Sequence, residues 1–209
     1  MKITIIGTGN VGSTLGGRWA GMGHQIIYGT RNPESNKIKS LLELQNGTQA
    51  KSIKDATASS GVIVLATPWT NAEETIKNMG DLTGKIIIDC TNPLKPDLGG
   101  LSLGFTTSAG EKVAEWAVGA HVIKAFNNTG SKNMGDPVYG SEKASMFICG
   151  DNDDAKKMVE GLISDLDFDV VDCGGITASR YLEPLAMLWI HLVFVAGMGQ
   201  DIAFRLLRR

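Results

Sequence analysis

The residues best placed to do chemistry form a short glycine-rich run near the start of the chain. The run follows an apolar segment at 2–6, precedes a segment of helical periodicity, and has the spacing GxGxxG: Gly7, Thr8, Gly9, Asn10, Val11 and Gly12. In such a run the first glycine permits a tight turn, the second lets a pyrophosphate approach the backbone, and the third lets the helix pack on the strand. The pyrophosphate then faces the positive end of a helix. The run therefore predicts a dinucleotide site.

The residues after the second apolar segment bear on which dinucleotide binds. Sites specific for NAD usually place Asp or Glu there to hold the ribose 2′-hydroxyl. This chain has Thr30 and Arg31 instead, with no carboxylate before Glu34, and Lys37 is a more distant cation. Arg31 can bind a 2′-phosphate through two parallel hydrogen bonds while stacking on adenine, and Thr30 can donate its hydroxyl. An arginine that simply faces solvent is the alternative, but the pattern favours NADP(H) over NAD.

Polar and proline-containing loops follow the later apolar segments. In an open parallel sheet, ligands bind at the carboxyl ends of the strands, where these loops lie. We expect them to contact the ribose and the nicotinamide, and to offer amides and a hydroxyl from 126–129 to a carboxamide or a second reactant. Trp69 could equally be ordinary packing. The residues predicted to bind here are Thr67, Pro68, Trp69, Asn92, Phe126 and Asn127.

Groups for strong acid–base chemistry or metal binding do not cluster in the sequence. The three histidines, His24, His121 and His191, are isolated from one another, and no catalytic residue or metal ligand is predicted. Hydride transfer between two bound cofactors needs positioning and exclusion of water more than it needs a strong acid or base. The residues are therefore compatible with hydride transfer.

Strand-like and helix-like segments alternate along the first 175 residues and would position these groups. Near-continuous Val/Ile runs indicate strands buried on both faces, which is typical of a parallel sheet with helices on each side. The expected fold is α/β, a doubly wound Rossmann fold with a mostly parallel sheet. Strands are expected at 2–6, 25–28, 62–66, 85–89, 121–126, 144–149 and 169–173, with a short one near 51–53, and helices at 12–22, 34–44, 52–58, 70–79, 108–117 and 153–166.

The alternation stops after Gly175, where Thr177–Leu207 is predicted to be one long helical region. No charged residue occurs from Pro184 to Gln200, but this run is shorter than the ~20 residues that span a bilayer, and it contains a histidine. A helix that is apolar all round must be covered, and a second subunit is the simplest cover. We therefore expect a Rossmann domain at 1–175 and a helical segment at 176–209 that makes a homodimer and completes an acceptor site. The glycine-rich stretch 97–104 is a candidate lid.

Size and composition narrow the function classes. A chain of 209 residues with 43% hydrophobic residues can bury one good core. Its net charge of −2 gives no electrostatic basis for binding nucleic acid. The three cysteines each end an apolar run and form no CxxC pair, so they indicate neither a disulfide framework nor a zinc site. The amino-terminal apolar run is too short for a signal peptide. A cytoplasmic location is the expectation.

These motifs together resemble one family, the F420H2:NADP+ oxidoreductases, and the related cytosolic domain of six-transmembrane metalloreductases. The matching residues cover nearly the whole chain: 7–12 with Asn10, Thr30-Arg31, Pro68-Trp69, HVIKAFNNTG at 121–130, CGD at 149–151, Ser179-Arg180 with Glu183, and GMG at 197–199. The resemblance implies NADPH as hydride donor. It also implies a second cofactor over the nicotinamide, either the deazaflavin F420 or a flavin such as FMN or FAD, with the carboxyl-terminal segment near it.

Three functions stay open at this point. The first is hydride transfer between NADPH and a flavin or deazaflavin. The second is reduction of a small imine or carbonyl, and the third is a non-catalytic NADP(H) sensor that reports redox state to a partner. Steady NADPH oxidation with a flavin or F420 would favour the first, turnover with a carbonyl or imine the second, and binding without turnover the third.

Overall fold

A computed structural model describes residues 1–209 and contains one large sheet with helices on both faces. The strands of this sheet are β1 (Lys2–Ile6), β2 (Gln25–Gly29), β3 (Gln49–Lys51), β4 (Val62–Leu65), β5 (Ile86–Asp89), β6 (His121–Lys124), β9 (Ser145–Gly150) and β10 (Asp169–Asp172). Their order is β10-β9-β6-β5-β4-β1-β2-β3, and β7 (Val138–Tyr139) and β8 (Glu142–Lys143) form a separate hairpin. Within the large sheet, neighbouring strands are parallel except for β6 and β9. The predicted Rossmann-like fold is confirmed.

Helices connect the strands close to the predicted positions. They are α1 (Asn10–Gly21), α2 (Asn36–Leu44), α3 (Ile53–Ala58), α4 (Ala72–Lys77), α5 (Ala109–Trp116), α6 (Ser131–Gly135), α7 (Asp153–Ser164) and α8 (Ser179–Phe194), with 3₁₀ turns η1 (Trp69–Asn71) and η2 (Ile176–Ala178). The helix predicted at 70–79 is therefore two pieces, a 3₁₀ turn followed by a short α-helix. Three side-chain caps explain where helices begin: Ser52 accepts from the N–H of Asp55, Ser108 from that of Glu111, and Asn152 from that of Ala155.

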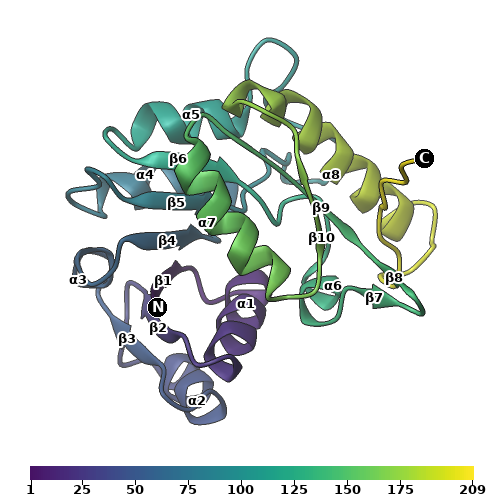
Figure 1. Ribbon diagram of the computed structural model, residues 1–209. Coiled ribbons are helices and arrows are strands. Elements are labelled where there is room, and N and C mark those ends of the chain that lie inside the picture. Colours follow the sequence, from purple (N-terminus) through teal and green to yellow (C-terminus); the bar gives the residue numbers. More distant parts are fainter.

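The sheet is buried on both faces, and the strand residues alternate between two hydrophobic clusters. Val62 and Val64 of β4 belong to the cluster beneath α1 and α7, whereas Ile63 and Leu65 belong to the cluster beneath α3, α4, α5 and the start of α8. Figure 1 shows α1 and α7 in front of the sheet, with α8 beyond β9. This two-sided burial explains why apolar runs such as 62–65 show no alternation of polar residues.

The prediction of one long carboxyl-terminal helix was wrong in its second half. Helix α8 ends at Phe194, and Gly197 and Gly199 then take φ values of +72° and +76°, which turn the chain back. The returning tail lies against β9, where the Ser145 N–H donates to the Phe204 carbonyl (2.9 Å). Apolar periodicity alone cannot separate a helix from an extended segment that is covered on one side. No helix here is both long enough and apolar enough to traverse a bilayer.

Candidate functional site

The glycine loop between β1 and α1 is built by backbone constraints that only glycine meets. Gly7 has a φ of +109°, and a Cβ there would lie 2.3 Å from the Ala66 carbonyl oxygen. A Cβ on Gly12 would lie 2.0 Å from the Gly7 oxygen, so this position lets α1 begin close to the strand. Gly9 differs, because a Cβ there would meet nothing within 4 Å and would enter open space. That space is available for a pyrophosphate, as a dinucleotide site requires.

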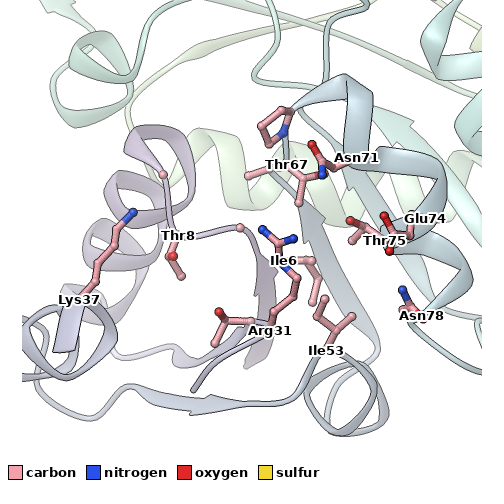
Figure 2. A pocket seen from close by; sticks show the side chains of 16 residues that line it. Ile6, Thr8, Arg31, Lys37, Ile53, Thr67, Asn71, Glu74, Thr75 and Asn78 are labelled. Atoms are coloured by element: carbon pink, nitrogen blue, oxygen red, sulfur yellow. The ribbon is translucent and has the colours of Figure 1, made fainter. Parts of the chain in front are cut away.

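A pocket of about 340 Å³ opens beside this loop, and Figure 2 shows the side chains around it. No side chain caps the first turn of α1, which is twelve residues long and begins at the loop. Such a helix start favours an anion. The pocket is lined by the loop, the ends of β1, β2 and β4, the starts of α2 and α3, and residues of η1 and α4: Ile6, Gly7, Thr8, Gly9, Gly29, Thr30, Arg31, Lys37, Ile53, Ala66, Thr67, Pro68, Asn71, Glu74, Thr75 and Asn78.

Two cations line this pocket. Arg31 extends from the end of β2 into the pocket, and Lys37 approaches from the first turn of α2, on the other side of Thr8 in the view of Figure 2. The neighbouring Lys39 pairs with Glu34 at 3.7 Å, whereas neither Arg31 nor Lys37 takes part in an ion pair. Sequence spacing placed Lys37 at a distance. The structure brings it to the pocket because α2 begins five residues after Arg31 and turns back toward the loop.

The predicted residues after β4 separate into two roles. Thr67 and Pro68 line the pocket, and the Thr67 hydroxyl oxygen is buried without a hydrogen-bond partner. Trp69 does not line it. Its ring stacks on that of Trp116, with centroids 5.2 Å apart and planes 24° from parallel, so one of its faces is occupied by α5.

The side chains of Asn92 after β5 and Asn127 after β6 hydrogen-bond each other, and Asn127 also hydrogen-bonds the backbone of α8. The Asn92 side-chain amide donates to the Asn127 carbonyl (2.8 Å), and the Asn127 amide donates to Asn92 Oδ1 (3.1 Å) and to the Leu182 carbonyl (3.1 Å). Nearby polar oxygens remain buried with no partner, namely Thr91 Oγ1, Asn127 Oδ1 and Asn128 Oδ1. Buried polar atoms normally have partners, so this edge of the sheet has free acceptors and a hydroxyl to offer a ligand.

The remaining predicted residues, Phe126, Asn10 and Val11, do not line the pocket. The Phe126 ring is 1% exposed and packs edge-on against Trp19 and Phe168, at 5.8 and 6.3 Å between centroids. Its backbone has a φ of +61°, an uncommon value for a bulky residue. Asn10 is exposed and Val11 is half-buried in the first turn of α1.

A second hollow of about 760 Å³ lies between the segment 101–105 and the first half of α8. Its lining is mostly apolar and includes Phe105 and Tyr181, which are 97% and 77% exposed. Arg180 is the cation of this hollow, but it makes a two-point hydrogen bond with Glu111, from Nε (2.9 Å) and from the terminal nitrogen (2.6 Å). Part of the predicted lid therefore forms one wall of this hollow, called here the α8 groove.

Cysteines and the CGD segment prove to be structural in their contacts. Burial raises the pKa of the Cys149 thiol to about 11, and the thiol lies 3.2 Å from the Ser179 hydroxyl. Burial likewise raises the pKa of the Cys90 thiol. Asp151 accepts a hydrogen bond from the Ile176 N–H (2.8 Å) at the start of η2. These thiols are protonated at neutral pH and poorly suited to nucleophilic chemistry.

Sequence reasoning did not anticipate the most deeply buried charges. Lys124 at the end of β6 is fully buried and pairs with Asp89 at the end of β5 and with Glu183 of α8. The available signal was a charged residue ending an otherwise apolar strand, in IIID and in HVIK.

Comparison with known proteins agrees with this geometry. Residues 2–93 match the family model described as NADP oxidoreductase coenzyme F420-dependent. The F420-dependent NADP reductase of Methanocaldococcus jannaschii is 31% identical over 211 residues, which cover 92% of each chain. Metalloreductase STEAP3 of Rattus norvegicus is 26% identical over 193 residues, which cover 90% of this chain and 37% of that protein.

Solved structures extend the match over the whole chain. An Arthrobacter sp. FB24 structure assigned to the F420-dependent NADP reductases has a TM-score of 0.92 and 31% identity, with 100% of both chains covered. A reductive aminase from Aspergillus terreus has a TM-score of 0.70 at 20% identity and shares the fold. The chain therefore belongs to the F420-dependent NADP reductase family of oxidoreductase enzymes.

Proposed function

We propose that this enzyme transfers a hydride between NADPH and a flavin or deazaflavin acceptor such as F420. The observation that carries the proposal is the pocket beside the glycine loop, which combines an open approach at Gly9 with two unpaired cations. Membership of a family that includes the F420-dependent NADP reductases of two archaea supports the choice of acceptor.

The dinucleotide would bind along the carboxyl ends of the strands. Its pyrophosphate would lie at Gly9 and at the start of α1, and its 2′-phosphate at Thr30, Arg31 and Lys37. Thr67 and Pro68 would then contact the ribose, and the unpartnered oxygens near Asn92 and Asn127 would bind the carboxamide, whose NH₂ group is a donor. When bound, the nicotinamide supplies the hydride, and the protein supplies orientation and a dry environment.

The acceptor would occupy the α8 groove. A tricyclic ring is planar and largely apolar, and it matches a mostly apolar groove whose one charged side chain, Arg180, is already neutralised by Glu111 outside the groove. The segment 101–105 would cover the ring and exclude water from the transfer.

A cofactor-screened assay of NADPH oxidation tests this proposal. The purified protein is mixed with NADPH and, separately, with F420, FMN, FAD, a small cyclic imine and a small carbonyl compound. We expect turnover with F420 or a flavin at least tenfold faster than with the imine or carbonyl. Faster turnover of the imine or carbonyl would replace the proposal with an imine- or carbonyl-reductase function, and tight NADPH binding without any turnover would replace it with a sensor.

We also propose that the outer face of α8 makes a homodimer. Large apolar side chains stand exposed along its second half at helical spacing and just beyond its end: Leu188, Phe194, Val195 and Met198. A symmetric pair of such helices covers both copies at once, and each Å² of apolar area removed from water contributes roughly 25 cal/mol. Analytical ultracentrifugation without detergent should show a dimer that Leu188→Glu converts to a monomer. A wild-type protein that sediments as a monomer refutes this part.

A further inference from the structure

The buried charges beneath the carboxyl edge of the sheet form a closed cluster. Lys124 Nζ lies 2.7 Å from Asp89 Oδ2 and 3.1 Å from Glu183 Oε1, and all three side chains are at most 1% exposed. Asp89 Oδ1 accepts the Thr91 N–H at 2.9 Å. Burial opposes the charge on Lys124, but the two carboxylates outweigh that effect and raise its pKa, so the lysine stays protonated.

The second carboxylate is balanced by a helix start rather than by a second cation. Glu183 accepts the backbone N–H groups of Ala109 (3.0 Å) and Gly110 (2.9 Å), the first two residues of α5. A side chain of α8 thus caps α5, whose partial positive charge offsets the surplus negative charge. Gly110 permits the close approach, because a Cβ there would lie 2.2 Å from the Ser179 hydroxyl oxygen.

A second set of contacts to α8 is made by the residues three positions beyond the ends of β5 and β6. β5 supplies Asp89 to the charges and is followed by Asn92, and β6 supplies Lys124 and is followed by Asn127. Asn92 and Asn127 bind each other, and Asn127 also binds the Leu182 carbonyl, next to Glu183. The ends of β5 and β6 therefore hold one turn of α8 through two sets of contacts. One set is the ion pairs of Lys124 with Asp89 and Glu183, and the other is the hydrogen bonds that join Asn92, Asn127 and the Leu182 carbonyl. Together they are called here the α8 clasp.

The residues held by the clasp alternate with those that line the α8 groove. Ser179, Leu182 and Glu183 face inward and are buried, whereas Arg180, Tyr181, Pro184 and Met187 line the groove. Directional bonds to Glu183 fix both the rotation of α8 and its position along its axis, which apolar packing alone specifies less sharply. A buried ion cluster adds little net stability compared with well-packed apolar residues, so stability alone does not explain it.

We propose that Lys124 and Glu183 are positioning residues that align the acceptor groove with the nicotinamide end of the dinucleotide site. This inference rests on the proposed function, because it takes the α8 groove as the acceptor site. The residues need not touch the reactants. They hold the wall of the groove at the distance that hydride transfer requires, where a displacement of about 1 Å can cost about 10²-fold in rate.

The test uses Glu183→Gln, because the obvious variant Lys124→Met would leave two buried carboxylates without their cation. Glu183→Gln keeps the side-chain shape and leaves Lys124 paired with Asp89. Lys156→Met is the matched control: Lys156 is a largely buried lysine paired with Asp172 at 2.8 Å, in α7 and β10, and it makes no contact with the clasp. Each protein is measured for melting temperature, NADPH dissociation constant, and kcat and KM with F420 and with FMN.

We expect Glu183→Gln to raise the acceptor KM, or lower kcat, so that kcat/KM falls at least tenfold while the NADPH dissociation constant changes less than twofold. Lys156→Met should lower the melting temperature and leave kcat/KM and the NADPH dissociation constant unchanged. If Glu183→Gln lowers only the melting temperature, as the control does, the clasp is merely structural and the inference is wrong.

Hydrogen–deuterium exchange separates this outcome from failure of the proposed function. If the wild-type protein oxidises NADPH with neither acceptor, the proposed function fails. The exchange rates then test whether the clasp positions α8, independently of turnover. Faster exchange at 108–111 and 179–184 in Glu183→Gln, with unchanged exchange at 7–12, supports the positioning role. Unchanged exchange at 108–111 and 179–184 overturns it.

Discussion

Replacement of Arg31 by alanine should change the choice between NADPH and NADH more than any other single substitution. Arg31 lines the glycine-loop pocket, is exposed, and has no carboxylate partner, so its charge is available to a 2′-phosphate. A hydrogen bond to a charged group contributes about 1.5–3 kcal/mol, and 1.4 kcal/mol corresponds to about tenfold in affinity. Arg31→Ala should therefore weaken NADPH binding by roughly 10- to 100-fold. NADH has no 2′-phosphate, so its affinity should change less than threefold.

The second cation moderates that loss and provides a further test. Lys37 lines the same pocket and remains after Arg31→Ala, so the single variant should fall nearer the tenfold end. The double variant that also carries Lys37→Ala should bind NADPH at least a further fewfold more weakly. Its NADPH affinity should also depend less on salt, because both charges that attract the phosphate are absent. Lys39→Ala is the matched control, since Lys39 lies in the same helix but pairs with Glu34.

Titration of the fluorescence of each reduced dinucleotide, at two salt concentrations, measures these affinities. The reasoning predicts a large loss for NADPH, almost none for NADH, and no change in Lys39→Ala. Equal weakening of both dinucleotides would place Arg31 at the adenine or pyrophosphate instead and would refute the assignment to the 2′-phosphate.

Three further substitutions test the site and the groove. Gly9→Val should fold with an unchanged melting temperature but lose NADPH binding by at least 100-fold, and wild-type affinity would show that the pyrophosphate lies elsewhere. Gly12→Ala should instead destabilise the fold by about 1–3 kcal/mol, seen in urea unfolding, since its Cβ would lie 2.0 Å from the Gly7 oxygen. Arg180 holds the pKa of Glu111 below its usual value, so this pair stabilises the protein above about pH 4.3 and the stabilisation is lost as the pH falls further. In Glu111→Gln, the free energy of unfolding should therefore fall less steeply as the pH is lowered through this range. The same pH dependence as in the wild type would show that the pair contributes nothing.

The dinucleotide half of the fold was predictable because its constraints are local. Gly12 is required by the nearby Gly7 carbonyl and Gly7 by the chain at the end of the adjoining strand β4, while the Val/Ile runs at 62–65 and 86–89 are buried along their whole length. The end of α8 was not predictable in the same way. Phe194, Val195 and Met198 continue the apolar pattern, but the positive φ values that end the helix region belong to glycines whose role depends on where the tail goes.

The buried cluster escaped prediction for a related reason. Asp89 and Lys124 are 35 residues apart, and Glu183 lies on a helix that reaches them only after the sheet has formed. Each of these charges alone resembles an ordinary solvated residue at the end of an element. Their pairing depends on β5 and β6 being neighbours in the sheet, which is a property of the topology and not of spacing along the chain.

This contrast between local and long-range construction bears on how the two halves of the site can vary. The pocket beside the glycine loop is built within the first 78 residues, so a single stretch of chain determines it. The α8 groove combines 101–105 with residues 180–187, and the clasp adds strand ends from between them. A substitution at Phe105 or Tyr181 can therefore alter the shape of the groove while the glycine loop and its cations stay in place. Changes in acceptor should accordingly be sought in 101–105 and 180–187, with NADPH affinity retained.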